Sequence, residues 1–176
     1  LTEAAQRHLG LRTGRVRSLA AYTVRYPLSE AQVLDFAKNC LADPVLHDVQ
    51  LGLPTAAPGF ASYILVARRP GVTDDEGTSA QNALADFLNE PLDVHTQHIF
   101  SKKLYLLENE LPADDLRRLA EELLGNKLIN WLEVGRLAEG IRDYTPRPGG
   151  GAEAVTEVIS LTGLSDAQLL QLSKDN

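Results

Sequence analysis

The chain is poor in the residues that carry redox and metal chemistry. It has one cysteine, one tryptophan and no methionine among 176 residues. A single cysteine cannot form an internal disulfide, and a chain without disulfides is typical of a reducing compartment. We therefore expect a cytoplasmic protein.

Long apolar runs and excess positive charge are also missing. No apolar run approaches the roughly 18 residues that span a bilayer, so we expect no membrane partner. A net charge of −7 leaves no general basic face, so we expect no nucleic-acid partner. The local exception is a group of four arginines. We interpret it as a solvated loop and strand face, with a phosphate or acidic-partner contact as the alternative: Arg12, Arg15, Arg17 and Arg25.

What the chain does contain is one stretch written twice. Residues 22–52 align with residues 105–135 without a gap, because 105 − 22 and 135 − 52 both equal 83. Few residues are identical, but apolar positions recur throughout, as in Val33 and Leu116 or Phe36 and Leu119. A shared burial pattern with divergent surfaces indicates a duplicated structural unit.

The first copy predicts helix, strand, helix and strand. A helix covers residues 1–9 and ends at Gly10, and a strand covers 16–26. Ser29 and Gln32 form a capping box ahead of the next helix. A closing strand is expected over 47–53. The packing face of the helix holds Val33, Phe36, Ala37, Cys40 and Leu41.

The second copy adds an opening strand. We expect strands over 60–68, 99–107 and 128–134. A capping box at Thr73–Glu76 begins one helix, and Pro112 begins the other. The internal alignment predicts that the first copy lacks its opening strand, with about 15 to 20 residues expected ahead of Leu1.

These elements predict an α+β fold. Two tandem β-α-β-α-β units with antiparallel sheets would be related by a pseudo-twofold axis, their sheets packed or joined. We divide the chain into a first repeat (1–53), a connector (54–59), a second repeat (60–135) and a linker with the start of a following segment (136–176). In the last part, residues 144–152 indicate a linker, 155–161 a β-prone run, and Ser165–Gln168 a third capping box.

Isolated reactive side chains do not assemble into a recognisable catalytic or metal motif. Cys40 aligns with Leu123 on a packed helix face, so we expect a buried thiol rather than a nucleophile. His95 and His98 are spaced for a shared metal but have no third ligand, so we interpret them as solvated. His8 and His47 stand alone.

Two glycine-containing turns resemble anion sites only weakly. Residues 69–74 lead from a strand to a helix start, but Asp74, Asp75 and Glu76 already occupy that positive end. The run 149–151 lacks the remainder of a phosphate loop, and we interpret it as linker. We accordingly predict no catalytic, cofactor-binding or metal residue in this chain.

Trp131 is the aromatic residue whose role the repeat leaves open. It aligns with Asp48 in the expected closing strands, so it serves either as core or as an exposed interface anchor of the second copy.

Residues 64–88 resemble PurS, the small subunit of phosphoribosylformylglycinamidine synthase. The likeness lies in an apolar strand, the turn RRPGVTDDEG and a helix that begins with SA. Residues 105–134 are similar to the rest of that subunit, and 41–46 carry the first copy's version of its ANPVI ending. Residues 161–174 look like the linker that follows in fused synthases, which carry tandem PurS-like units.

The resemblance implies a role in the glutamine- and ATP-dependent amidation of formylglycinamide ribonucleotide in purine biosynthesis. PurS does no chemistry in that family. It bridges the synthetase (PurL) and glutaminase parts, which would be this chain's partners in cis or in trans. ATP and magnesium are expected only in a catalytic domain absent from this sequence, so the fragment is not expected to act as an enzyme alone. A homodimer remains open. The alternative is a tandem ferredoxin-like module that senses a small metabolite.

Overall fold

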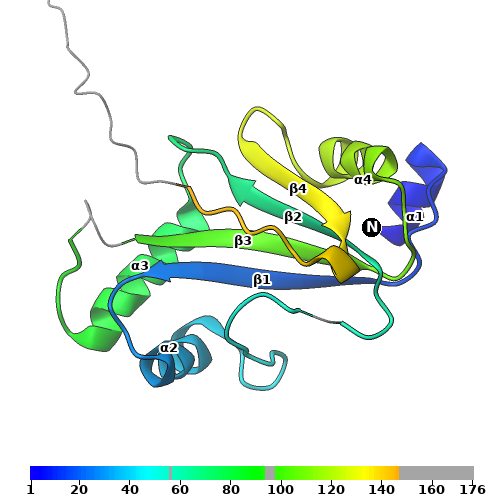
Figure 1. Cartoon of the computed structure of the whole chain (residues 1–176). Coiled ribbons are helices and arrows are strands. Elements are labelled where there is room, and N and C mark those ends of the chain that lie inside the picture. The colour runs from blue at the N-terminus through cyan, green and yellow to red at the C-terminus, as the bar shows by residue number, and fades with distance from the viewer. Residues whose placement is uncertain (56, 94–97, 147–176) are drawn as a thin grey trace, which may run out of the picture.

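The computed structural model describes residues 1–55, 57–93 and 98–146. Its centre is one four-stranded sheet in the order β1-β3-β2-β4, with every neighbouring pair antiparallel. The strands are β1 (Val16–Arg25), β2 (Ser62–Arg68), β3 (His98–Leu107) and β4 (Asn130–Arg136). The helices and the antiparallel sheet confirm the α+β class, and the sheet contains strands from both halves of the chain (Figure 1).

The helices lie against the sheet at its two ends (Figure 1). Three of them finish in a π-helical turn: α1 (Thr2–Ala4) with η1 (Ala5–Leu9), α2 (Glu30–Phe36) with η2 (Ala37–Leu41), and α4 (Ala113–Leu119) with η3 (Ala120–Leu124). The longest helix is α3 (Asp75–Leu88), and a short 3-10 turn, η4 (Leu137–Glu139), follows β4.

All four helices pack on the same face of the sheet. One buried cluster joins α1, η1 and α4 to Ile64 and Leu107, and a second joins α2 and α3 to Ile99. Leu107 and Ile99 are both odd-numbered residues of β3, and alternate residues of a strand share a face. This face therefore carries two apolar clusters, one at each end of the sheet.

The opposite face is covered by irregular chain. Its buried residues include Tyr63, Leu65, Leu104 and Leu106. Side chains of the connector around Leu53 and Phe60, and of the segment around Leu137 and Ile141, pack against them. In Figure 1 the segment after η4 runs in orange across the strands.

Most predicted elements are confirmed within one or two residues. The helix over 1–9 ends at Gly10, whose φ of 71° is the left-handed conformation that glycine adopts most easily. The Ser29–Gln32 capping box is formed in full. The run 155–161 and the third capping box lie outside the described residues.

The strand expected over 47–53 is wrong, because these residues adopt no strand conformation. Its counterpart β4 is hydrogen-bonded to β2. In the described part of the chain β1 pairs with β3 alone, and the order of strands in the sheet places no β2-like strand beyond β1. A closing strand needs that neighbour to satisfy its backbone groups.

The second capping box is displaced by one residue from the predicted position. Asp74, not Thr73, caps α3: its carboxylate accepts the Gly77 amide at 2.9 Å and the Ser101 amide at 2.7 Å. A carboxylate that accepts bonds from both the helix start and β3 is a stronger cap than a threonine hydroxyl.

Candidate contact surface

The cysteine predicted to be buried is exposed. Cys40 lies in η2, on the rim of an open hollow of about 370 Å3 that Tyr22, Leu41 and the start of α3 also line. The repeat assigned it to a packed face because Leu123 packs against the helical cluster that contains Ala5 and Leu9. The hollow leaves the Cys40 position without equivalent cover. Partial desolvation raises the pKa of the Cys40 thiol, and the Asp35 carboxylate adds to this.

The histidines do not converge. His98 lies half-buried in β3 with its ring 5.6 Å from that of Phe100, and its Nε2 atom has no hydrogen-bond partner among the described residues. His95 falls outside those residues. Exposed His47 accepts the Asp43 amide on Nδ1 at 3.0 Å. Within the described ranges, no three His, Cys, Asp or Glu side chains are placed to hold a metal ion.

The four arginines are spread along β1 and the loop before it rather than gathered. Arg15 pairs with Glu108 at 3.1 Å, and the guanidinium groups of Arg15 and Arg17 lie over the ring of Phe60. Arg25 lies over Phe100. The bonds from the Arg15 amide and side chain lower the pKa of Glu108. This arrangement agrees with a solvated face whose cations are held by local contacts.

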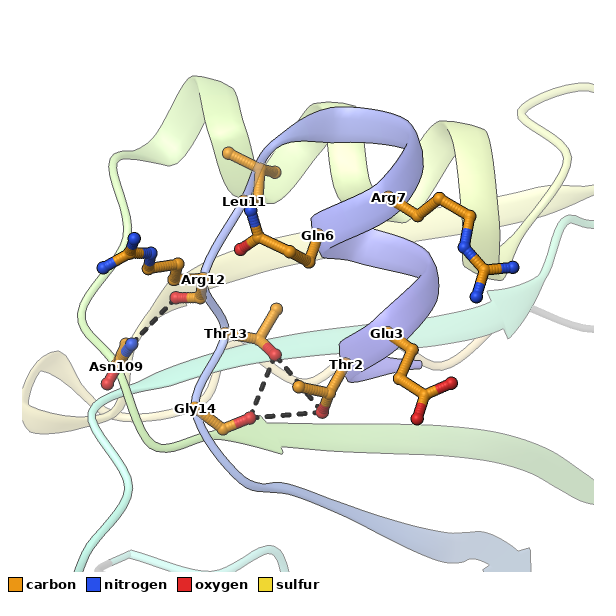
Figure 2. A pocket seen from close by; sticks show the side chains of 9 residues that line it. All are labelled: Thr2, Glu3, Gln6, Arg7, Leu11, Arg12, Thr13, Gly14 and Asn109. Atoms are coloured by element: carbon orange, nitrogen blue, oxygen red, sulfur yellow. Dashed lines mark hydrogen bonds between the residues drawn. The ribbon is translucent and has the colours of Figure 1, made fainter.

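The largest hollow lies between the N-terminal helix and the loop that follows it, with a volume of about 630 Å3 (Figure 2). Its polar centre is internal: Thr13 Oγ1 donates to the Gly14 carbonyl at 3.0 Å, and Thr2 Oγ1 donates to the same oxygen at 3.2 Å. Figure 2 shows Arg7 and Arg12 pointing to opposite sides of the hollow. Its charged groups therefore do not converge on a common ligand.

The strand-to-helix turn before α3 is used by the protein's own side chains. Gly71 takes a φ of 80° in the turn, and Arg69 Nε donates to the Asn130 carbonyl at 3.0 Å. The Asp74 carboxylate occupies the helix start. A capped helix start offers an external phosphate little.

Residues 141–145 form a strap across the face of the sheet that carries no helix. Lys102 in β3 is 3% exposed, and its ammonium group donates to Asp143 and to Thr145 Oγ1, the latter at 3.2 Å. The Arg142 amide donates to the Tyr63 hydroxyl at 3.1 Å. The strap thus supplies both partners of the one charged residue buried among those described.

Trp131 belongs to this strap-covered face. It is 37% exposed, and its ring stacks on that of Tyr144 with centroids 4.5 Å apart and an interplanar angle of 8°. One face of the indole therefore packs on the strap while a third of the side chain remains open. Both alternatives from the sequence hold in part, since the residue is neither core nor a free anchor.

The exposed apolar side chains recur at repeat-equivalent positions. Val45 and Leu46, after η2, are 88% and 77% exposed. Leu128 and Ile129, after η3 and 83 residues later, are 77% and 40% exposed. We call these two pairs the apolar tips. An apolar pair that stays exposed in both copies is typical of a protein contact surface.

Sequence reasoning missed Lys102 and its partners. The available signal was the alternation in residues 98–107, which places Lys102 on the same face as Leu104 and Leu106. Nothing in the sequence marked Asp143 and Thr145 as the groups that cover it.

No helix in the described part of the chain is both long enough and apolar enough to cross a membrane. No family model, no curated protein and no solved structure matches this chain.

Proposed function

We propose that this chain is a tandem PurS-like scaffold of phosphoribosylformylglycinamidine synthase, and that it binds the synthetase part without doing chemistry itself. The observation that carries the proposal is the recurrence of the apolar tips at the same place in both copies. The motif resemblance over residues 64–88 and 105–134 supplies the identity of the partner.

The helices support two tandem units. α2 and α4 have bounds that differ by 83 residues at both ends, and so do η2 and η3. The π turns close with equivalent bonds: the Ala42 amide donates to Ala37 and the Gly125 amide to Ala120, both at 2.9 Å. Such agreement in an unusual turn favours duplication of one unit.

The pairing of β1 with β3 supports a pseudo-twofold relation between the units. Ala20 pairs with Lys103, which stands at its repeat-equivalent position 83 residues later. Because the ladder is antiparallel, a twofold axis through this pair exchanges the two strands. The pair lies near the middle of each strand, so the exchange superposes nearly their full lengths.

The two helical clusters are related in the same way. Phe36 and Leu119 are both fully buried, one in each cluster, at equivalent positions. Further equivalent residues divide between the clusters in the same manner: Val16 with Ile99, Tyr22 with Tyr105, Leu28 with Leu111, and Leu41 with Leu124. One packing solution used twice accounts for this correspondence.

The proposal is tested by complex formation with a synthetase from which its own PurS-like region has been deleted. We expect a stoichiometric complex in sedimentation velocity. Replacing both Leu128 and Ile129 by aspartate puts two charges into the apolar contact, so we expect affinity to fall at least about tenfold.

A matched control adds a negative charge elsewhere: Gln6→Asp, on the exposed surface of η1, is expected to leave the complex unchanged. Melting curves establish that each variant is folded. Absence of a complex with the unaltered chain contradicts the proposal. Tight binding of an amino acid or nucleotide by the chain alone would favour the metabolite-sensing alternative instead.

A further inference from the structure

β1 is an edge strand of ten residues with one side unoccupied. The Glu108 amide donates to the Arg15 carbonyl at 2.9 Å, which fixes the phase of the ladder. Antiparallel alternation then points the N–H and C=O groups of every second residue away from β3. These outward residues are Val16, Ser18, Ala20, Tyr22 and Val24.

The side chains of β1 are correspondingly less buried than those of its counterpart. Every residue of β1 is half-buried or exposed. The β3 residues equivalent to Ala21, Thr23 and Val24 are all leucines, at positions 104, 106 and 107, and at most 1% exposed. The difference arises because β3 has β2 on its other side. A long edge left in this state is normally covered or blunted.

The same missing neighbour explains the failure of the strand expected over 47–53. In the second unit β2 lies between β3 and β4 and bonds to both. In the first unit β1 and residues 47–53 stand where β3 and β4 stand. One additional strand between them would satisfy both sets of backbone groups.

We propose that the outer edge of β1 receives an apolar strand of about seven residues that runs antiparallel to it, like β2. The six residues from Ser62 to Ala67 are buried from both faces, so the occupant must be apolar on both faces. Because β2 precedes α3 and β3 along the chain, the occupant enters from the N-terminal side of α1. Its register follows from the β2–β3 ladder and spans Val24 to Leu19. This inference rests on the tandem-unit part of the proposed function and not on the synthetase.

A second copy of β1 fits this edge poorly. Antiparallel self-pairing centred on Ala21 would set Arg17 of one copy opposite Arg25 of the other, at both ends of the ladder. Like charges directly opposite each other destabilise a sheet. A β2-like strand brings no charge opposite these positions until its last residue.

The test is a full chain extended by a copy of its own residues 60–83, joined directly ahead of Leu1. Leu1 is the repeat equivalent of Leu84, so the added segment stays in phase with the repeat. We expect amide hydrogen exchange at the five outward positions of β1, and across residues 47–53, to slow by at least about tenfold. The unfolding temperature should rise.

A matched control carries aspartate in place of Ile64 and Val66 within the added copy only, and is expected to show no such protection. Exchange in β1 that is unchanged by the extension overturns the proposal. It is also overturned if the unextended chain protects the same amides by forming a dimer in sedimentation. The synthetase-binding experiment uses the unextended chain, so its failure is distinguishable from the failure of this one.

Discussion

At the scale of single residues, Lys102 is the side chain whose environment departs most from its chemistry. An ammonium group that is almost fully buried must be paired, because an unpaired buried charge is strongly destabilising. Its partners come from the strap, and Asp143 keeps about half of its own side chain in solvent. The pair therefore ties the strap to the sheet.

Removing either partner of this pair should have unequal effects. Asp143→Asn leaves Lys102 buried without its counter-charge, so we expect a loss of about 1–3 kcal/mol in the free energy of unfolding. Lys102→Met removes the buried charge while Asp143 stays hydrated, so we expect a change below about 1 kcal/mol or a gain. Urea denaturation measures both.

The neighbouring Lys103 provides the matched control. It is half-exposed and pairs with Glu76 at 3.1 Å, so Lys103→Met should change stability by no more than about 0.5 kcal/mol. Equal losses for the Asp143 and Lys102 variants would contradict this account of the strap.

Glu108 makes stability depend on pH in the acid range. Bonds from the Arg15 amide and side chain lower the pKa of its carboxyl in the folded state. A carboxyl with a lowered pKa stabilises the fold above its unfolded value of about 4.3, and this is lost as pH falls through the folded pKa. We therefore expect the stability difference between the wild type and Glu108→Gln to shrink as pH is lowered.

Denaturant titrations at a series of pH values measure this difference. In an Arg15→Gln background the difference should shrink but persist, because the Arg15 amide at 2.8 Å remains a donor. A difference that is independent of pH would contradict the assignment.

At the scale of elements, the helices were more predictable than the strands at the edge of the sheet. Capping residues and apolar periodicity are local, so they located α2, α3 and α4 within a residue or two. A strand also needs a neighbour, and the composition of residues 47–53 carries no information about whether that neighbour is present. For the same reason the repeat could not show that Cys40 lies beside an open hollow.

The two helical clusters should contribute to one cooperative unit. Phe36 and Leu119 are fully buried, each in its own cluster, and both clusters rest on β3. We expect Phe36→Ala to cost about 3–5 kcal/mol and Leu119→Ala about 2–5 kcal/mol, each within a single unfolding transition.

Calorimetry and far-ultraviolet circular dichroism measure these transitions. Leu46→Ala, at a residue 77% exposed, is the control and should change stability by no more than about 0.5 kcal/mol. Two separate transitions in either core variant would mean that the clusters unfold independently despite the shared strand.

At the scale of the whole molecule, the sequence predicted the α+β class and most of the elements, while the candidate site came mainly from the structure. Alternation and capping located the strands that β1 and β3 contribute, but their pairing is a long-range contact that no local pattern encodes. The exposure of the apolar tips was likewise invisible, since the sequence shows only that these positions are apolar.

The measurement that tests the central claim most directly is glutamine-dependent amidation of formylglycinamide ribonucleotide by a synthetase deprived of its PurS-like region, with glutaminase present. We expect addition of this chain to restore activity in a saturable way, and the Leu128→Asp, Ile129→Asp variant to require at least about tenfold more protein. No restoration at any concentration, together with no complex, would contradict the proposal that this chain is a scaffold of that enzyme.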